Sequence, residues 1–203
     1  MKKLSILLLF SVFLLSAGST FAQKLKSGDL KMLKGQTTLN VQYDYSQLKV
    51  GKKSVDDYEK EGVAERNRKK PGSGDEWLTK WKSDKTDRFQ PMFEKNFNDK
   101  TSHAGTKIDP VAAEAKYTLI VRVLFLEPGF QSGVGIHKPA YLNMDIDVVE
   151  TSAPDKVLAT VEFHKIPSVN MMGYDFDAGS RMQSCFDRAG DDFGKFFLKN
   201  GLK

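Results

Sequence analysis

Residues 141–166 read "YLNMDIDVVETSAPDKVLATVEFHKI", two alternating stretches joined by a polar turn at 151–155. Strict alternation of apolar and polar residues predicts strands with one buried and one solvent-facing side. The residues expected to face inward are Leu142, Met144, Ile146 and Val148 at 141–150, and Val157, Ala159, Val161 and Phe163 at 156–166. The two patterns agree in parity, so we expect a β-hairpin with an apolar face and a wet polar face.

Two further strands are expected beside this hairpin. Residues 117–127, "YTLIVRVLFLE", are apolar on both sides, which is typical of a central strand. The second side of this strand carries Ile120, Leu124 and Leu126 together with Arg122. Residues 37–45, "TTLNVQYDY", alternate and predict a half-buried strand.

Three helices are expected around the sheet. The first, 54–70, begins with a hydroxyl cap at Ser54 and ends in the basic run "RNRKK". The second, from about residue 75 to 98, has an aromatic stripe at helical spacing, and Pro91 should kink or split it. The members of this stripe are Trp77, Trp81, Phe89, Phe93 and Phe97. The last helix, from about 178 to 199, carries Cys185 within its apolar stripe.

The order strand-helix-helix-strand-strand-strand-helix predicts one α+β domain, an α/β sandwich over residues 23–203. We expect a mixed sheet of about four strands with the helices mainly on one face. The first two strands, joined through helices, should be parallel, and the last three should form an antiparallel meander. Residues 23–35 are rich in Lys and Gly and are expected to be mobile.

Residues 1–22 have the features of a secretory signal peptide. Lys2 and Lys3 precede an apolar run, and Thr20-Phe21-Ala22 suits a cut between Ala22 and Gln23. The run is shorter than the roughly 20 residues that a membrane span requires. The positions where a lipoprotein signal has its cysteine hold Gly18 and Ser19. We therefore expect a periplasmic or secreted protein that is not a lipoprotein and has no transmembrane segment after cleavage.

Charge and cysteine content narrow the function classes. Without Lys2 and Lys3 the chain has 29 basic and 26 acidic side chains, a net charge of +3. A nucleic-acid binder usually concentrates positive charge more strongly and adds stacking aromatics, so we expect no nucleic-acid partner. The single cysteine, Cys185, excludes an intramolecular disulfide, and its place in an apolar stripe predicts a buried thiol.

Candidate metal ligands lie on the expected polar face of the hairpin. Parity places Asp145, Glu162 and His164 on this face, where they could collect a divalent metal. The alternative is an ordinary solvated strand face. The run "DFDAG" at 175–179 lacks three features of a calcium loop, and its acidic residues are better explained as caps of the last helix. The sequence predicts no cofactor.

No pattern indicates an enzyme. The sequence has no G-x-S-x-G motif, and a cysteine inside a helical apolar stripe is not an activated nucleophile. Asp145 and Glu162 could act as paired carboxylates, but a flat sheet face offers no cleft to separate their pKa values.

The glycine-rich stretch at 127–141, "EPGFQSGVGIHKPAY", joins the central strand to the hairpin. Its glycines fit neither the phosphate-binding nor the dinucleotide-binding spacing, and Pro139 and a strand follow instead of a helix. Tightly joined antiparallel strands need only two to five residues between them. The longer connection suggests recognition, and the best candidates for contact with a ligand or partner are Phe130, His137 and Lys138.

Three stretches carry a resemblance to a known group of proteins. "KYTLIVRVLFLEPGF" at 116–130 is followed by the hairpin at 141–167, whose turn region reads "ETSAPDKVLA", and then by an amphipathic helix. Over residues 110–200 this resembles the small α/β domain of the lipoprotein activators of penicillin-binding proteins and of the periplasmic domain of the curli secretion channel. The resemblance implies an envelope module for binding or assembly, without catalytic activity.

These observations lead to two functional hypotheses. The first is an exported, non-catalytic module that binds an envelope or secreted protein, or a second copy of itself to cover Ile120, Leu124 and Leu126. The alternative is a secreted protein that binds a small ligand or a metal through residues 128–139 and the polar sheet face.

Overall fold

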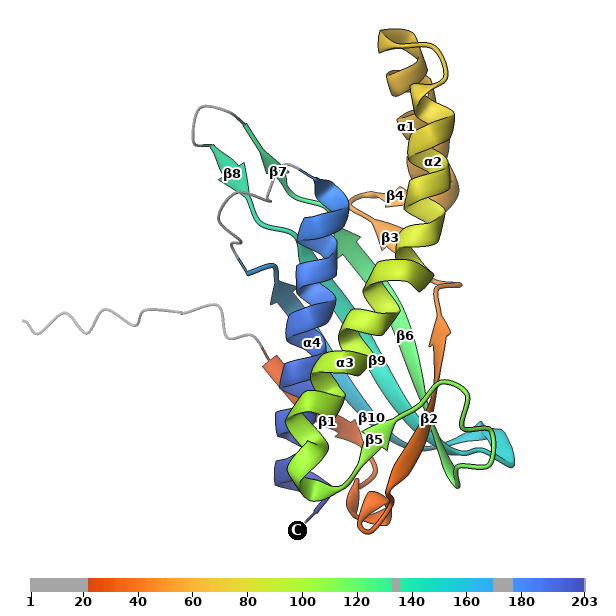
Figure 1. The fold of residues 1–203 in the computed structure, drawn as a ribbon, viewed down its shortest axis with the longest axis vertical. Helices are drawn as coiled ribbons and strands as arrows, with labels where there is room; N and C mark the ends of the chain where they lie inside the picture. Colours follow the sequence, from red (N-terminus) through yellow and green to blue (C-terminus); the bar gives the residue numbers. More distant parts are fainter. Residues whose placement is uncertain (1–21, 133–135, 170–176, 203) are drawn as a thin grey trace, which may run out of the picture.

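The computed structural model describes residues 22–132, 136–169 and 177–202. The predicted central strand and hairpin form the middle of the sheet as β6 (Tyr117–Glu127), β9 (Tyr141–Glu150) and β10 (Ala153–Pro167). The flanking strands are β1 (Ala22–Ser27), β2 (Thr38–Asp44) and β5 (Lys107–Ile108), which give the order β1-β10-β9-β6-β2-β5 (Figure 1). Two short strands, β3 (Lys49–Val50) and β4 (Lys53–Ser54), continue the sheet beside the end of β6.

The predicted strand directions are confirmed, but the predicted strand number was too low. β2 pairs with β6 in parallel, and β6, β9 and β10 pair in antiparallel fashion. The described part of the sheet has eight strands instead of about four. Three of the additional strands, β3, β4 and β5, have two residues each, which is too short for an alternation to be recognised.

Residues 23–35, which we expected to be mobile, form regular structure. β1 pairs along β10, and a 3₁₀ turn, η1 (Lys31–Leu33), follows it. Leu30 and Leu33 are fully buried. The prediction was wrong because the strand that pairs with β1 lies more than a hundred residues further along the chain. The local composition of residues 23–35 gives no information about such a partner. The predicted signal peptide lies outside the described residues, except that Ala22 begins β1.

Two irregular positions in the strands change the predicted orientation of side chains. A register shift between Val123 and Phe125 turns Leu126 toward the core, where it pairs with Leu142. Leu126 is therefore fully buried within the chain and needs no partner for cover. A second shift, between Val157 and Ala159, leaves Val157 exposed although alternation predicted it to be buried. Extra residues of this kind reverse the side-chain parity of a strand.

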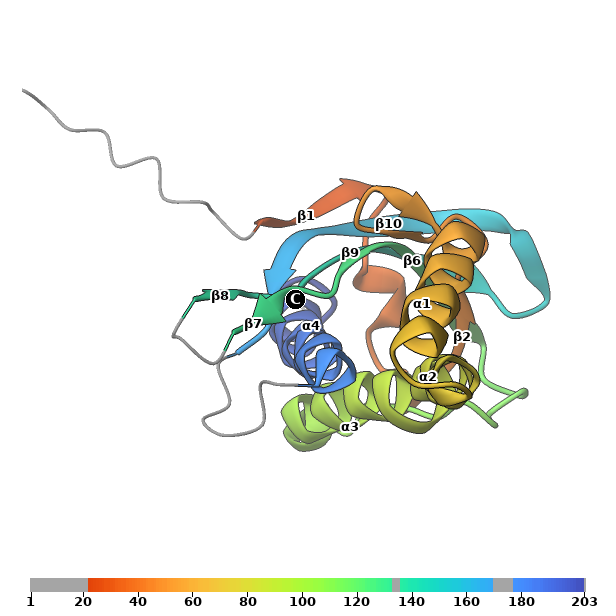
Figure 2. The same cartoon turned by 90° about the horizontal axis from the view of Figure 1, so that it is seen from above.

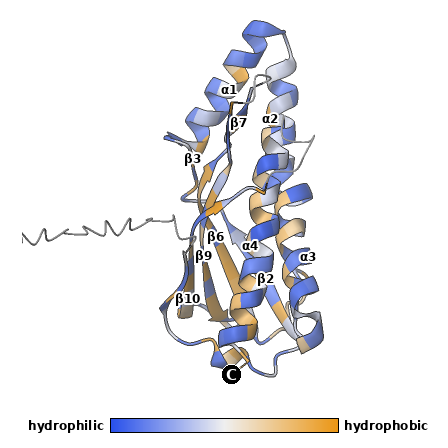
Figure 3. Ribbon diagram, turned by 90° about the vertical axis from the view of Figure 1, so that its left-hand side faces the viewer, coloured by the Kyte–Doolittle hydropathy of each residue, from blue (hydrophilic) through white to orange (hydrophobic). Residues whose placement is uncertain are grey.

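The helices α3 (Gln90–Thr101) and α4 (Ala178–Asn200) cover the concave, apolar face of the curved sheet (Figure 2). Phenylalanines of the two helices interlock between them, with Phe89 stacked on Phe186 and Phe97 on Phe193. Phe163 reaches the same cluster from β10. Hydrophobic residues are concentrated in the strands and on the sides of the helices that face them (Figure 3). No helix in the described ranges has the length and apolarity to cross a membrane.

The expected long helix continues through Pro91. α2 (Ser73–Asp84) leads into a π-helical segment, η2 (Lys85–Phe89), and then into α3. Pro91 has no N–H to donate to the carbonyl of Asp87, and its ring would clash with that carbonyl in a regular helix. The wider π-helical turn lies at these residues and divides the expected helix into α2 and α3, as one of the two predicted outcomes had it.

A helical hairpin projects beyond the end of the sheet. It consists of α1 (Val55–Lys69) and α2, which pack on each other (Figure 1). No residue of α1 is buried, and the helix is largely hydrophilic (Figure 3). The aromatic stripe of the long helix is thus divided between two partners. Its second half packs in the core between the helices and the sheet, whereas Trp77 and Trp81 also pack on Tyr58 of α1.

Candidate ligand-binding cleft

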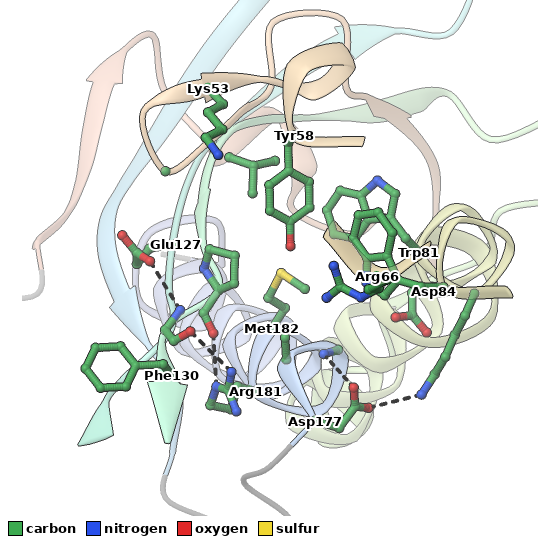
Figure 4. Close-up of a pocket in the computed structure, with 18 of the residues that line it drawn as sticks. Lys53, Tyr58, Arg66, Trp81, Asp84, Glu127, Phe130, Asp177, Arg181 and Met182 are labelled. Carbon is green, nitrogen blue, oxygen red and sulfur yellow. Dashed lines mark hydrogen bonds and ion pairs between the residues drawn. The ribbon is translucent and has the colours of Figure 1, made fainter. Parts of the chain in front are cut away.

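A cleft of about 870 Å³ lies where the α1–α2 hairpin, the start of the 127–141 connection and the first turns of α4 meet (Figure 4). The turn between β3 and β4 closes one side. The lining includes Lys52, Lys53, Tyr58, Arg66, Lys69, Trp77, Lys80, Trp81, Asp84, Glu127, Phe130, Gln131, Asp177, Arg181 and Met182. Residues far apart in the sequence therefore form one concave surface, which is the usual shape of a small-molecule site.

The α1 wall of the cleft is fixed at its first residue and along its packing with α2. Ser54 caps α1, and its hydroxyl accepts a hydrogen bond of 3.1 Å from the Asp57 N–H. Gly62 lies against the Trp77 ring, and Gly74 approaches the carbonyl of Val63. The two glycines allow the close approach of the helices that places α1 over the cleft.

An aromatic cluster sets the positions of the polar groups. The Tyr58 ring lies 5.6 Å from Trp77 and 5.2 Å from Trp81, centroid to centroid. The Trp81 indole N–H donates to Glu59 at 2.9 Å. The Arg66 guanidinium carbon lies 4.1 Å from the ring centroid of Trp77, a cation–π contact. Figure 4 shows the Tyr58 hydroxyl and the Arg66 guanidinium directed to the middle of the cleft.

Tyr58 provides a neutral hydroxyl in this setting. Burial raises the pKa of Tyr58, and the nearby positive charge of Arg66 only partly offsets this effect. The hydroxyl therefore keeps its proton at neutral pH and can donate or accept a hydrogen bond.

The opposite wall is held by Arg181 of α4. Its guanidinium donates to the carbonyls of Pro128 and Gly129 at 3.0 and 3.2 Å. Gly129 has a φ of +63°, and a Cβ there would approach the Lys138 carbonyl to 2.2 Å. Only glycine suits this conformation and contact. The side chain of Phe130 follows directly, at the rim of the cleft and 49 % exposed.

The floor of the cleft is an ion-paired network between α2 and the start of α4. Arg88 donates to both Asp84 and Asp177 at 3.1 Å, and Lys80 lies 3.4 Å from Asp177. Burial by itself would raise the pKa of Asp177. Hydrogen bonds from Arg88 and the Gly179 N–H, with the charge of Lys80, outweigh it and lower this pKa to about 2. Asp177 also caps α4 through that bond to Gly179, as the sequence indicated.

One candidate from the 127–141 stretch lies in the lining of the cleft, and two lie outside it. Phe130 is part of the lining, whereas His137 and Lys138 lie on β8 (His137–Lys138), paired with β7 (Phe130–Gln131). Lys138 forms an ion pair with the lining residue Glu127 at 2.8 Å. His137 is exposed and is not among the lining residues.

The proposed metal ligands are held by cations on the convex face of the sheet. Asp145 contacts Arg122 at 3.3 Å and Lys26 at 3.2 Å, and Glu162 contacts Lys24 at 3.4 Å. Asp145 is 3 % exposed, so the face predicted to be wet is partly covered by its own ion pairs. Among the described residues, no three or more His, Cys, Asp or Glu form a group that could hold a metal ion. The structure therefore does not bring Asp145, Glu162 and His164 together as a metal site.

Sequence reasoning missed Tyr58, Arg66 and Arg181. The signal for Arg66 was the basic run at 66–70, which helix-dipole effects explained equally well. Arg181 lies beside Met182 near the start of the last helix and is 6 % exposed, an unusual burial for an arginine. Neither the basic run nor the position of Arg181 in the sequence indicates that residues 127–131 lie beside both α1 and α4.

Comparisons with known proteins give similarity only at the level of structure. No known protein family and no curated protein matches this sequence. The chain is similar to the PelC dodecamer from Paraburkholderia phytofirmans, with a TM-score of 0.39 and 11 % identity over 84 % of this chain and 96 % of that chain. A variant of the same dodecamer gives a TM-score of 0.34 and 12 % identity over 83 % and 96 % of the two chains. Likeness at this level carries no argument about function.

Proposed function

We propose that this chain is an exported, non-catalytic binding protein of the cell envelope and that the cleft between the α1–α2 hairpin and α4 is its ligand site. The observation that carries the proposal is the composition of the cleft. Aromatic side chains and charged groups from four separate segments converge on one concavity of about 870 Å³. A concave surface on which polar groups from separate segments converge is a typical ligand site.

The state of the acidic groups supports binding over catalysis. A general acid or base needs a pKa near the working pH. Asp177, the acidic group at the start of α4, has a pKa of about 2 and so stays ionised at neutral pH. The Cys185 thiol is fully buried in the core, and burial raises its pKa, which suppresses the reactive thiolate.

Export and the envelope setting rest on the predicted signal peptide and on the resemblance of residues 110–200 to envelope modules. Self-association stays a prediction. Self-association was predicted in order to cover Ile120, Leu124 and Leu126. Leu126 is buried within the chain and needs no such cover, whereas Ile120 and Leu124 remain half-buried on the convex face.

Intrinsic fluorescence tests the site directly because the only two tryptophans of the chain, Trp77 and Trp81, both line the cleft. We expect at least one fraction of envelope components to change the emission of purified residues 23–203. The change should be lost in Phe130→Ala and retained in Val111→Ala, a matched change at an exposed apolar residue outside the cleft. Binding, measured by calorimetry, that proceeds equally in both variants without an emission change would refute the proposed site.

A further inference from the structure

We infer that the ligand of this cleft is an acidic saccharide, a chain of sugar rings that carry carboxylates. The inference rests on the proposed function and names the ligand class of the same site. Three observations carry it: the charge balance of the cleft, the geometry of Arg66, and the pairing of the backbone around it.

The cleft has an excess of positive charge. Six basic side chains line it, against three acidic ones. The basic ones are Lys52, Lys53, Arg66, Lys69, Lys80 and Arg181. Two of the acidic groups, Asp84 and Glu127, are also paired with Arg88 and Lys138, which stand outside the lining. Two lining lysines, Lys53 and Lys69, are likewise paired with the outer residues Glu61 and Glu65. The outer partners cancel one another. Arg181 is engaged with the carbonyls of Pro128 and Gly129 and is left out of the count, so an excess of two positive charges remains to attract an anion.

Arg66 is arranged to receive a carboxylate. One Nη donates to the Gly62 carbonyl at 3.1 Å, and the Trp77 ring supports one face of the guanidinium. These contacts fix the plane of the group and use only one of its five N–H donors. The guanidinium points into the cleft beside the Tyr58 hydroxyl (Figure 4). A planar, pre-oriented arginine binds a carboxylate through two parallel hydrogen bonds.

The remainder of the lining suits sugar rings. Phe130 offers an exposed aromatic ring at the rim, against which the apolar face of a sugar can pack. Tyr58 and Gln131 supply neutral hydrogen-bonding groups for hydroxyls, and the Glu127 and Asp84 carboxylates supply acceptors. Acceptors inside a cationic cleft favour a ligand that carries many O–H donors as well as negative charge.

An acidic peptide would bring the same charge but would find little backbone to pair with. Extended peptides are commonly bound by addition to a free strand edge. Around the cleft, β3 is paired on both sides, by β4 and β6, whereas β4 and β7 each have one strand partner among the described residues. Their open edges are only two residues long, so they could form few hydrogen bonds with a peptide. Arg181 occupies the carbonyls of Pro128 and Gly129. Within the described lining, recognition therefore depends on side chains, which favours the saccharide.

Tryptophan fluorescence of residues 23–203, titrated with tri-galacturonic acid, tests the inference. We expect saturable binding at least tenfold tighter than that of neutral galactotriose, and weaker at high salt. Arg66→Ala should weaken binding of the acid at least tenfold and remove most of the preference for the acid over galactotriose. The matched control is Arg68→Ala, an exposed arginine of the same helix outside the lining. Circular dichroism of both variants establishes that they fold.

Three outcomes overturn the inference. Equal binding of the acidic and neutral trisaccharides removes the role of charge. Equal or tighter binding of tri-glutamate assigns the cleft to acidic peptides. If neither tri-galacturonic acid nor tri-glutamate binds while an envelope fraction still changes the tryptophan emission, the ligand is not an acidic saccharide, but the proposed function is unaffected. If no fraction changes the emission either, both fail.

Discussion

The Arg66 guanidinium lies 4.1 Å from the ring centroid of Trp77, and Gly62 lies against the same indole from one turn earlier on α1. A Cβ on Gly62 would approach the indole to 2.4 Å. Gly62→Ala should therefore displace Trp77 and, with it, Arg66. Alanine gains about 1 kcal/mol in helix propensity, but overpacking costs roughly 1–3 kcal/mol. We expect a net loss of stability and a shifted tryptophan emission maximum, measured by urea unfolding and fluorescence.

The control for this change is Lys60→Ala, an exposed position on the same helix. It should alter neither the emission maximum nor, beyond about 0.5 kcal/mol, the free energy of unfolding. An unchanged emission in Gly62→Ala would contradict the close packing of α1 on α2.

The contact of α3 with α4 depends on Gly190. A Cβ at this position would meet the Phe93 carbonyl at 2.2 Å, and a backbone atom cannot rotate away. At Gly194 the nearest atoms instead belong to the Lys100 side chain, at 2.7 Å. We expect Gly190→Ala to cost about 2–3 kcal/mol by forcing the helices apart. Gly194→Ala should cost clearly less. Thermal unfolding of the two variants provides the measurement, and equal losses would count against it.

The sequence predicted the parts of the fold in which local pattern and burial agree. The strands at 117–127 and 141–166, the cap at Ser54 and the buried Cys185 all follow from alternation, capping and helical spacing. Val157 and Leu126 were placed on the wrong side because one extra residue reverses parity, and composition does not mark a bulge. β1 was missed because its only strand partner, among the described residues, is the distant β10.

The site was predicted less well than the fold. Phe130 was a candidate because a connection longer than its geometry requires suggests contact, and it lies in the lining of the cleft. Its neighbours in the cleft come from α1, α2 and α4, and only the packing of Tyr58 between two tryptophans brings them to one place. The polar sheet face was misjudged for a related reason. Alternation places Asp145 on that face but does not show that Arg122 and Lys26 neutralise it.

The carboxylates on the convex face predict a stability effect at Arg122. Its guanidinium contacts Asp147 at 2.7 Å and Asp145 at 3.3 Å, and both carboxylates are more than nine-tenths buried. Arg122→Ala would leave two neighbouring buried negative charges with less compensation. Breaking a buried pair costs about 3–5 kcal/mol, and the partial exposure of Arg122 reduces this to roughly 2–4 kcal/mol. Urea unfolding at neutral pH provides the measurement.

A double-mutant cycle separates this electrostatic effect from the loss of the arginine side chain. Asp147→Asn in the Arg122→Ala background removes one of the uncompensated charges. The double variant should therefore be more stable than the sum of the single losses implies. Strict additivity would show that the pair contributes little and that packing dominates.

The network around Asp177 makes stability depend on acid pH. Its folded pKa of about 2 lies below the roughly 3.9 of an unfolded aspartate. A lowered folded pKa contributes stability above the unfolded value, and this contribution is lost as the pH falls from about 4 to 2. Because the side chain is 43 % exposed, solvent screening limits the effect to about 1 kcal/mol. Asp177→Asn should flatten that part of the stability profile, measured by urea unfolding between pH 6 and pH 2. Asp155→Asn, at an exposed position of β10, should leave the slope unchanged. If both variants keep the slope of the unchanged chain, the contacts of Arg88 and Lys80 with Asp177 do not stabilise the start of α4.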